Sequence, residues 1–334
     1  AEFFEAGGWE RPRWYDSNAD LVERYEDQIE DLRRPNEWDS RWWSPIMLGE
    51  HLHLRNNVGM IGDTGFGILD IIGSDAEENM ERLCVASMDI DVDDAVYTPV
   101  LAPNGGFVAD LTVARLGENH YRVITGGAHA GQDKTWFENH LEGDAELLSR
   151  SSEFCTLGVW GPNAEGLMDS IAEEPMTADS FDFAEMKDVT INGVSAKAFR
   201  ISYVGEFGWE LYAPMDRGQR LWDTIYEAGQ EFDIRPVGTG VYGETGRMEK
   251  GYRLMGAELE IDYTPAEAGL TFHGVKDANF IGKAAYAEGI DEENTATLCT
   301  LSVMDHAPDG GQPRFATVGP PTPDGDGNLP IDHE

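Results

Sequence analysis

The feature that most constrains the fold is an alternation of apolar and polar side chains with a period of two, which runs from Val96 to Thr125. Successive side chains of a β-strand point to opposite faces, so this period predicts strands that each bury one face. Pro103-Asn104-Gly105-Gly106 is a strong turn signal, and Gly117-Glu118-Asn119 is a second one. The segment therefore predicts a three-stranded meander with strands at residues 96–101, 107–116 and 121–125, followed by a helix at 132–148.

The pattern recurs later in the chain. Strands are predicted at residues 189–191, 194–203 and 209–213, with Asn192-Gly193 as the first turn. The helix after them begins at Asp216, where Gln219 completes a variant of the capping box, and ends at Gly229. Two units of meander plus helix predict the α+β class, with two similar subdomains around a shared cleft.

Three domain-level segments follow from the remaining patterns. Residues 1–45 form an N-terminal lead segment with a helix at 20–33, and residues 46–290 form the core, with further helices at 46–56 and 75–84. A strand is expected at 295–303, and a loop rich in Pro, Gly and Asp follows it. We therefore expect residues 291–334 to be only the start of a third domain.

The charge balance argues against two classes of binding partner. With 63 Asp and Glu against 24 Lys and Arg, the net charge is −39, which repels nucleic acid and anionic membranes. Acids spread along a chain that is 41% hydrophobic are typical of a globular protein from a salt-loving organism. Three separated cysteines and the lack of a signal pattern or a long apolar run favour the cytoplasm.

Three carboxylates are candidates for chemistry. Asp110 lies inside a predicted strand, on the same face as Val108 and Thr112, where an unpaired carboxylate is costly. It is either bonded to a nearby amide or has a chemical role. Glu206 and Glu210 lie four residues apart around the second turn, and the residues alone fit either a solvated acidic turn or one inward glutamate.

Other motifs are weaker. Gly238-Thr239-Gly240-Val241-Tyr242-Gly243 fits the dinucleotide fingerprint, but no parallel βαβ pattern surrounds it. His51 and His53 could be two metal ligands, although no third ligand is obvious nearby. Asp324-Gly325-Asp326-Gly327-Asn328 begins like a calcium loop and then has Leu329 where the turn glycine belongs, so it is rejected. No nucleophile elbow, phosphate loop or Ser/His/Asp constellation occurs.

An ordered set of motifs spans residues 48–286. They are Glu50-His51, Asn57-Val58-Gly59-Met60, Tyr97-Thr98, the strand from Gly105 to Asp110, the stretch from Tyr203 to Leu211, Arg247-Met248-Glu249-Lys250-Gly251, the stretch from Thr264 to Leu270, and Phe280-Ile281-Gly282-Lys283. This set resembles the glycine-cleavage T-protein superfamily of tetrahydrofolate-dependent aminomethyltransferases. The resemblance implies a cloverleaf of two antiparallel-sheet α+β subdomains around a folate cleft, with the start of a C-terminal β-barrel.

The resemblance also implies roles for single residues. Asp110 matches the aspartate taken to be catalytic, while Tyr97 and Tyr203 match tyrosines of the pterin site. Glu210 matches the glutamate that hydrogen-bonds the pterin ring, and Arg247 matches an arginine of the folate site. These roles are physically reasonable, because a carboxylate accepts ring N–H groups in pairs and tyrosine can flank a flat ring. Asp110 would orient a cationic donor and stabilise positive charge. No metal is expected.

The chain departs from the aminomethyltransferase pattern at three places. Thr125-Gly126-Gly127-Ala128-His129 stands where T-proteins commonly have an Asn. This stretch, the lead segment 8–14 and Lys250-Gly251-Tyr252-Arg253 are closer to the folate domains of dimethylglycine and sarcosine dehydrogenases, whose flavin domain is absent here. Most of the expected barrel is also missing. The donor is therefore open between a lipoyl-bound aminomethyl group, an N-methylated glycine and an S- or O-methyl group, and candidate partners are a lipoyl carrier protein or a flavin dehydrogenase subunit.

The leading hypothesis is an enzyme that transfers a one-carbon unit, aminomethyl or methyl, from a small donor to tetrahydrofolate. A second hypothesis is a non-catalytic folate-binding regulator, like relatives in iron–sulphur assembly that carry a Lys-Gly-Cys-Tyr motif. The matching segment here, Phe280-Ile281-Gly282-Lys283, lacks the cysteine, which argues against it. A third hypothesis is a nicotinamide-dependent oxidoreductase built on the glycines at 238–243.

Overall fold

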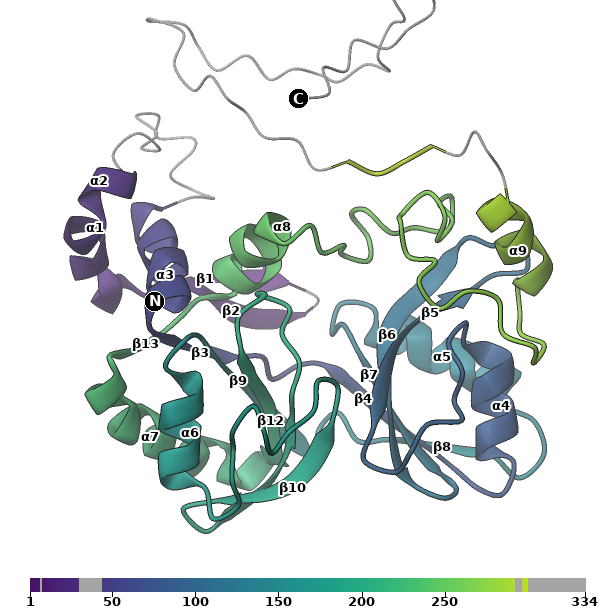
Figure 1. The fold of residues 1–334 in the computed structure, drawn as a ribbon, viewed down its shortest axis with the longest axis horizontal. Helices are drawn as coiled ribbons and strands as arrows, with labels where there is room; N and C mark the ends of the chain where they lie inside the picture. Colours follow the sequence, from purple (N-terminus) through teal and green to yellow (C-terminus); the bar gives the residue numbers. More distant parts are fainter. Residues whose placement is uncertain (7, 30–43, 292–295, 300–334) are drawn as a thin grey trace, which may run out of the picture. The chain divides into compact units, whose positions relative to one another are not determined.

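The fold was obtained as a computed structural model, which describes residues 1–6, 8–29, 44–291 and 296–299. Residues 1–300 form one compact unit, shown in Figure 1, and residues 301–334 are a second unit that lies outside the described residues. Of the strand predicted at 295–303, residues 296–299 are described and have no regular secondary structure; its other residues and the rest of the expected third domain after residue 299 lie outside the described residues. In the described part, no helix is both long and apolar enough to cross a membrane.

The first sheet confirms the first predicted meander. Its five strands are all antiparallel and lie in the order β5-β6-β7-β4-β8. The bounds are Ala95–Leu101 for β5, Phe107–Gly117 for β6, His120–Thr125 for β7, Gly67–Ile72 for β4 and Glu146–Ser149 for β8. Strands β4 and β8 were not predicted from the sequence.

The second sheet contains the second predicted meander. Its six strands lie in the order β10-β11-β12-β9-β3-β13, and all pairs are antiparallel except β13 with β3. The bounds are Met186–Ile191 for β10, Val194–Phe199 for β11, Gly208–Pro214 for β12, Phe154–Trp160 for β9, Val58–Gly62 for β3 and Ile234–Pro236 for β13. The strand predicted at 194–203 ends at Phe199, so Tyr203 lies in the loop before β12.

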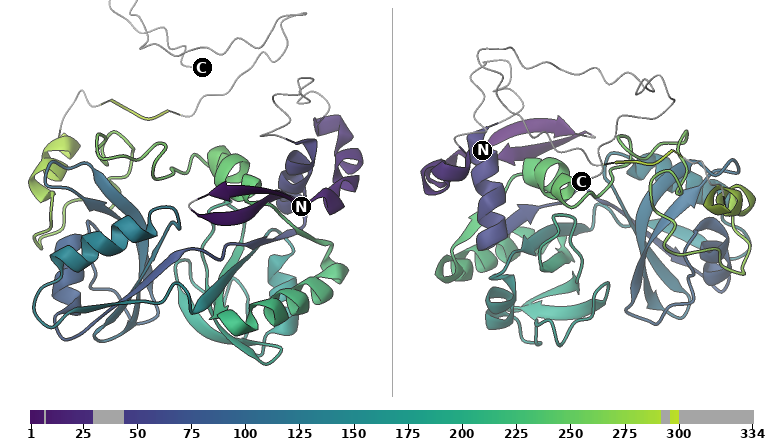
Figure 2. Two further views of the ribbon diagram at one scale, coloured as in Figure 1. Left: turned by 180° about the vertical axis from the view of Figure 1, so that it is seen from behind. Right: turned by 45° about the horizontal axis from the view of Figure 1, so that its top comes forward.

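Each sheet has two helices packed on one face, as Figures 1 and 2 show. Helices α4 (Ala76–Leu83) and α5 (Ala130–His140) cover the five-stranded sheet, where Met80 and Phe137 enter its apolar core. Helices α6 (Ala164–Ile171) and α7 (Gly218–Gly229) cover the six-stranded sheet through Leu167 and Leu221. The predicted pair of similar α+β subdomains is thereby confirmed.

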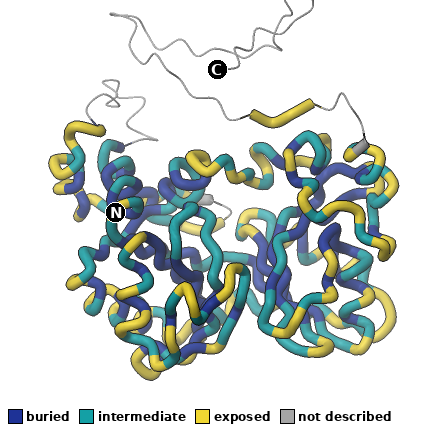
Figure 3. Tube along the Cα trace, viewed as in Figure 1, coloured by how far each residue is buried: buried dark blue, intermediate teal, exposed yellow. Residues whose placement is uncertain are grey.

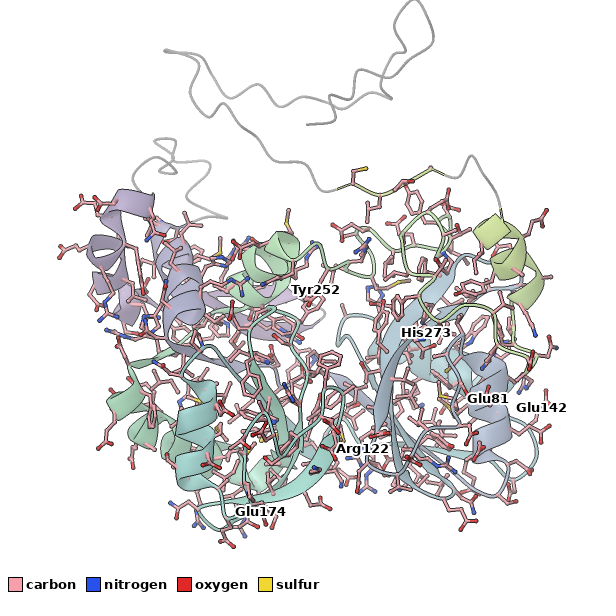
Figure 4. The ribbon with its side chains drawn as sticks, in the orientation of Figure 1. Glu81, Arg122, Glu142, Glu174, Tyr252 and His273 are labelled. Atoms are coloured by element: carbon pink, nitrogen blue, oxygen red, sulfur yellow. The ribbon has the colours of Figure 1, made fainter. Side chains whose placement is uncertain are left out.

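The faces without helices meet each other. Ile68, Ala114 and Ile124 of the five-stranded sheet form one buried cluster with Phe199 and Tyr212 of the six-stranded sheet. The buried segments in Figure 3 follow the strands of both sheets. At the same junction the buried pair of Arg122 and Asp70 lies next to Phe154, whose ring centroid is 4.7 Å from the Arg122 guanidinium (Figure 4).

The N-terminal segment is bonded to the core. It forms a hairpin of β1 (Glu2–Ala6) and β2 (Trp9–Trp14), and the buried carboxylate of Glu50 ties the chain after it to the core. Glu50, on α3 (Pro45–Asn56), accepts hydrogen bonds from Tyr15 N at 2.7 Å, from Asn18 Nδ2 at 2.8 Å and from Gly238 N at 2.8 Å. Three donors on one buried carboxylate fix the entry of the lead segment.

Three local predictions are wrong. The helix predicted at 20–33 is interrupted at Tyr25, where α1 (Asp20–Arg24) ends and α2 (Glu26–Ile29) begins; the rest lies outside the described residues. The helix predicted at 132–148 ends at His140, since Leu141 is extended and Gly143 has φ of +68°, and the chain then pairs with β4 as β8. The predicted capping box at Asp216 does not form, because α7 starts at Gly218 without a side-chain cap.

The last described part has little regular structure. A π-helical turn, Val241–Gly246, leads into α8 (Arg247–Glu249), and α9 (Lys283–Asp291) follows a long irregular segment. This segment is bound to the five-stranded sheet through an apolar cluster that includes Leu101, Phe107, Leu270 and Tyr286. It brings residues 253–255 to the edge of the junction between the sheets.

Candidate active site between the two sheets

A cavity of about 440 Å³ lies where the two helix-free faces meet. Both sheets, the N-terminal hairpin and the segment after the π-helical turn contribute to its walls, and this volume is typical of a small-molecule site. The lining residues with polar groups are Arg11, Tyr97, Asp110, Thr112, Thr125, His129, Asp133, Ser202, Tyr203, Glu210, Thr239, Tyr242, Glu244 and Arg253. Four of the five residues that the sequence predicted for the site are among them.

Asp110 lies on β6 and is held by a neighbouring strand. The phenol of Tyr97, on β5, donates a hydrogen bond to Oδ2 of Asp110 at 3.1 Å. Burial raises the pKa of Asp110 to about 6, against the lowering effect of this bond, and the nearby Asp133 raises it further. The carboxyl group is therefore oriented, half-buried at the cavity wall and able to change its charge close to neutral pH.

Asp133 is a second acid at the same wall, and sequence analysis missed it. It lies in the first turn of α5, is 1% exposed, and accepts a short hydrogen bond at Oδ2 from the hydroxyl of Thr125. Its other oxygen, Oδ1, has no hydrogen-bond partner among the described residues. Burial raises the pKa of Asp133 to about 6, while the Thr125 hydroxyl and the charge of His129 lower it.

Glu210 projects from β12 into the opposite wall. It is 6% exposed and accepts a short hydrogen bond from the phenol of Tyr212. Burial raises the pKa of Glu210 to about 7, and the hydrogen bonds from Tyr212 and Tyr242 lower it. Glu206, by contrast, pairs with Arg55 at 3.0 Å on the outer side of the loop, so the two glutamates have different surroundings.

Aromatic rings cover the loop side of the cavity. Tyr203 donates its hydroxyl to the carbonyl of Arg253 at 2.5 Å. Its ring is stacked on Tyr252, with centroids 5.9 Å apart, and lies 5.1 Å from the ring of Tyr242. Figure 4 marks Tyr252 on the irregular segment that follows α8. Flat faces and an acid therefore lie within one site.

Arg247 is the one predicted site residue that does not line the cavity. It is buried and its guanidinium donates to the carbonyl of Gly243 at 2.8 Å, to Glu258 at 2.8 Å and to the carbonyl of Tyr252 at 3.1 Å. These bonds hold together the two segments that carry Tyr242 and Tyr252. A direct role of Arg247 in folate binding stays a prediction.

Asp63 is a further acid that sequence analysis missed. It follows β3, is 0% exposed, and neither of its carboxyl oxygens has a hydrogen-bond partner in the described part of the chain. Glu210 and Tyr212 are two residues apart on β12, so their side chains point to the same face of the sheet. Their partners on β9 are Gly158 and Thr156, which lie beside Ile61 and Asp63 of the β3 segment. Asp63 therefore lies on the same face as Glu210 and Tyr212. Burial raises the pKa of Asp63 to about 8, and the charge of Glu210 adds to this effect.

The competing motifs have structural roles. A Cβ atom on Gly238 would lie 2.0 Å from the carbonyl oxygen of Arg13, so this glycine permits the N-terminal segment to pack closely. His51 contacts Glu249 at 3.0 Å, whereas His53 contacts the carbonyl of Asp233 at 2.6 Å, so the two histidines do not converge. Within the described ranges, no group of three or more metal-binding side chains occurs.

The fold and the cavity define a class: α+β proteins in which two mainly antiparallel sheets with outer helices flank an acidic, tyrosine-lined site. A family model described as the GCVT N-terminal domain matches residues 1–277, and the chain belongs to this family. The predicted T-protein resemblance is therefore confirmed.

Individual relatives agree with this assignment. The chain is 32% identical over 271 residues to an aminomethyltransferase of Bacillus cereus (strain AH187), covering 79% of this chain and 74% of that protein. It is 32% identical over 312 residues to the mitochondrial dimethylglycine dehydrogenase of Mus musculus, covering 91% of this chain but only 34% of that enzyme. The chain thus spans about a third of the length of that relative.

A solved structure confirms the fold. The glycine cleavage system aminomethyltransferase T from Bartonella henselae superposes with a TM-score of 0.70 at 20% sequence identity, covering 87% of this chain and 71% of that chain. The T-protein-like arrangement of the two subdomains, predicted from the motifs, is confirmed by this match.

Proposed function

We propose that the chain transfers a one-carbon unit, aminomethyl or methyl, from a small donor to tetrahydrofolate. The observation that carries the proposal is the cavity that has Asp110 with Tyr97 on one wall and Glu210 with Tyr212 on the other. Membership of the GCVT N-terminal domain family and the name aminomethyltransferase of a relative support the same reaction class.

The residues present fit a folate as the acceptor. Glu210 lines the cavity with a carboxylate whose pKa is raised by burial, and a ring with N–H donors would pair with its ionised form. The faces of Tyr203 and Tyr242 lie in the same cavity and can flank a flat ring. Tetrahydrofolate, when bound, supplies the nucleophilic nitrogen that receives the carbon.

Asp110 acts on the donor in this proposal. Its ionised carboxylate, oriented by Tyr97, attracts the positive charge of the donor and stabilises it where the carbon is transferred. Holding donor and acceptor in one cavity removes much of the entropic cost of their meeting. The proposal needs no covalent intermediate with the protein.

The proposal also includes a partner protein or domain that delivers the donor. The motif resemblance implies two routes for delivery of the carbon unit: a lipoyl carrier protein, or a flavin dehydrogenase domain or subunit. The names of two relatives, an aminomethyltransferase and a dimethylglycine dehydrogenase, are consistent with these two kinds of donor. Both would present a small donor to the same cavity.

Acceptor binding tests the first half of the proposal. Calorimetric titration of the wild-type chain with tetrahydrofolate should show saturable binding, and Glu210→Ala should weaken it by at least about tenfold, since a hydrogen bond to a charged group is lost. Glu227→Ala, an exposed position on α7, is the matched control and should bind normally. Undetectable binding of tetrahydrofolate to the wild type would contradict the proposal.

Turnover tests the second half. Incubation with tetrahydrofolate and a panel of methylated and aminomethyl donors should yield methyl- or methylene-folate with the wild type. Asp110→Asn should keep acceptor binding and lose turnover, while the exposed Asp223→Asn should behave as the wild type. Binding without any product across the panel would instead support the non-catalytic regulator.

A further inference from the structure

Arg11 is a cation at the cavity wall that has no acceptor in the described part of the chain. It lies on β2 of the N-terminal hairpin, lines the cavity and is half-buried. Its side chain makes no hydrogen bond or ion pair with a described residue, whereas Arg253, the other arginine of the wall, donates to the carbonyl of Gly251 at 2.7 Å. In a chain with 63 Asp and Glu against 24 Lys and Arg, a half-buried guanidinium without a carboxylate needs an explanation.

The end of the Arg11 side chain is accessible from the cavity. Its Nε atom is buried without a partner, but the two Nη atoms are not, and since no described residue accepts from them, both keep accessible surface. Nη2 lies 3.2 Å from the place that a Cβ atom on Gly127 would take, and Gly127 itself lines the cavity. It lies 2.8 Å from the corresponding place on Gly65. Side chains at these two loop glycines would crowd the guanidinium.

The acids near Arg11 do not neutralise its charge. Glu244, which also lines the cavity, is paired with Arg13 at 2.5 Å, and Arg13 lies two residues from Arg11 on the same face of β2. Burial raises the pKa of Asp63 to about 8, although the charge of Arg11 lowers it, so this acid is largely neutral at neutral pH. The guanidinium therefore keeps its full charge beside the space that a ligand would fill.

The chemistry of this position selects one class of anion. A guanidinium presents parallel N–H groups that match the two oxygens of a planar carboxylate. Asp110, Asp133 and Glu210 line the same cavity and, when ionised, repel each negative charge of a ligand. A carboxylate with one charge therefore fits better than a phosphate monoester, which carries about two charges near neutral pH.

We propose that Arg11 binds a carboxylate of a ligand in the cavity and thereby makes the N-terminal hairpin part of the binding site. The inference rests on the proposed one-carbon transfer, whose two ligands can each supply this group. One source is the glutamyl tail of tetrahydrofolate, and the other is the acid group of an amino-acid donor. Either one would give the guanidinium the acceptor that the described protein does not provide.

The first arm of the experiment tests the acceptor as the source. Calorimetric titrations of the full chain compare tetrahydrofolate with 6-methyltetrahydropterin, which has the reduced ring without the tail. If the tail binds to Arg11, Arg11→Met should weaken tetrahydrofolate binding by at least about tenfold, the value of a charge-assisted hydrogen bond. The affinity for 6-methyltetrahydropterin should not change, which a general distortion of the cavity would not predict.

The second arm tests the donor as the source and uses no folate. Ligand-observed NMR titrations at neutral pH compare N-methylglycine with N-methylglycinamide, which has an amide in place of the carboxylate. If the donor binds to Arg11, the wild type should prefer the acid by at least about tenfold. Arg11→Met should bring the ratio of the two dissociation constants close to one.

Two further variants guard the interpretation. Arg11→Lys keeps the charge but loses the paired N–H groups, so its effect should lie between those of the wild type and Arg11→Met. Arg217→Met removes an exposed arginine from another part of the surface and should leave both comparisons unchanged. The thermal unfolding midpoint of each variant checks that it is folded.

The outcomes separate this inference from the proposed function. A change in either arm for a folded Arg11→Met supports the inference and identifies the source of the carboxylate. A folded Arg11→Met that behaves as the wild type in both arms overturns it. If the wild type does not bind tetrahydrofolate, the proposed function fails, and the second arm alone then decides on Arg11: no preference of the wild type for N-methylglycine overturns its role.

Discussion

Tyr97 donates its phenolic hydrogen to Oδ2 of Asp110 at 3.1 Å, across the pair of strands β5 and β6. The bond favours the ionised form of Asp110, in opposition to burial, which favours the neutral form. The charge of the proposed catalytic group therefore depends on a hydroxyl that itself lies at the cavity wall.

Tyr97→Phe should move the acid limb of activity to higher pH. The hydrogen bond from Tyr97 lowers the pKa of Asp110, so its removal raises that pKa above about 6, and the active ionised form is lost earlier as the pH falls. The measurement is kcat/KM against pH for the wild type and the variant. Tyr226→Phe, at an exposed position, is the control; an acid limb that does not move in Tyr97→Phe would contradict the assignment of Asp110.

Asp133→Asn should move the acid limb of the activity profile to lower pH. The charge of Asp133 raises the pKa of Asp110, and a neutral amide removes this effect, so Asp110 stays ionised to lower pH. The pH profile of kcat/KM checks the sign of this shift. A shift to higher pH would show that the two acids do not interact as the structure indicates.

Acceptor binding should weaken as the pH falls through about 7. The pKa of Glu210 is raised to about 7 in the free protein, so below this value the carboxyl is protonated and cannot accept two N–H groups. Calorimetric titrations with tetrahydrofolate, from about one unit below to one unit above that pH, measure the effect. Glu210→Gln should bind weakly throughout, and a pH dependence retained by this variant would assign the titration to another group.

Asp63→Asn should stabilise the protein above neutral pH. The folded pKa of Asp63 is raised to about 8 from 3.8, so its contribution to stability is full below pH 3.8 and is lost as the pH rises towards 8. The amide cannot ionise and avoids this loss. Urea unfolding at about pH 8.5 should give a higher free energy of unfolding for Asp63→Asn, on the order of a few kcal/mol, and the gain should shrink at about pH 5.

Gly238→Ala should destabilise the fold, while Gly243→Ala should not. The added Cβ at position 238 would lie 2.0 Å from the carbonyl oxygen of Arg13, whereas position 243 has no neighbouring atom within 4 Å. A loss of about 1–3 kcal/mol in the free energy of unfolding is expected for Gly238→Ala, as for other overpacked sites.

The fluorescence of NADH should not change when it is mixed with the wild type. An enhancement that both glycine variants abolish would support the dinucleotide hypothesis instead.

The meanders were predictable because turn signals separate their strands, although the structure buries both faces of most of these strands. Strands β5, β6, β7 and β12 lie beside strong turn signals, and most were located to within a few residues. Strand β3 was missed, because four of its five residues are buried and no alternation of polar and apolar side chains remains. The helix predicted past His140 was wrong, since pairing with β4 decides the conformation of residues 146–149 and no local pattern shows it.

The site was predicted in part. Asp110, Tyr97, Tyr203 and Glu210 were found from an unusual strand aspartate and from the family motifs, and all four line the cavity. Asp133 was missed because it stands between Gln132 and Lys134 in a polar helical turn, which is typical of a solvated position. Its burial comes from Thr125 and from the packing of α5 against the sheet, contacts that only the tertiary structure supplies.

The passage of the chain from β3 directly into β4 has a consequence for folding during synthesis. Strand β4 finds its partners within the next 80 residues or so, at 120–125 and 146–149, so the five-stranded sheet can close early. Strand β3 pairs only with residues 157–160 and 234–236, which leave the ribosome much later. We therefore expect the hydrogen-bonded ladder of the five-stranded sheet to form before that of the six-stranded sheet, whose edge strand β13 is made later.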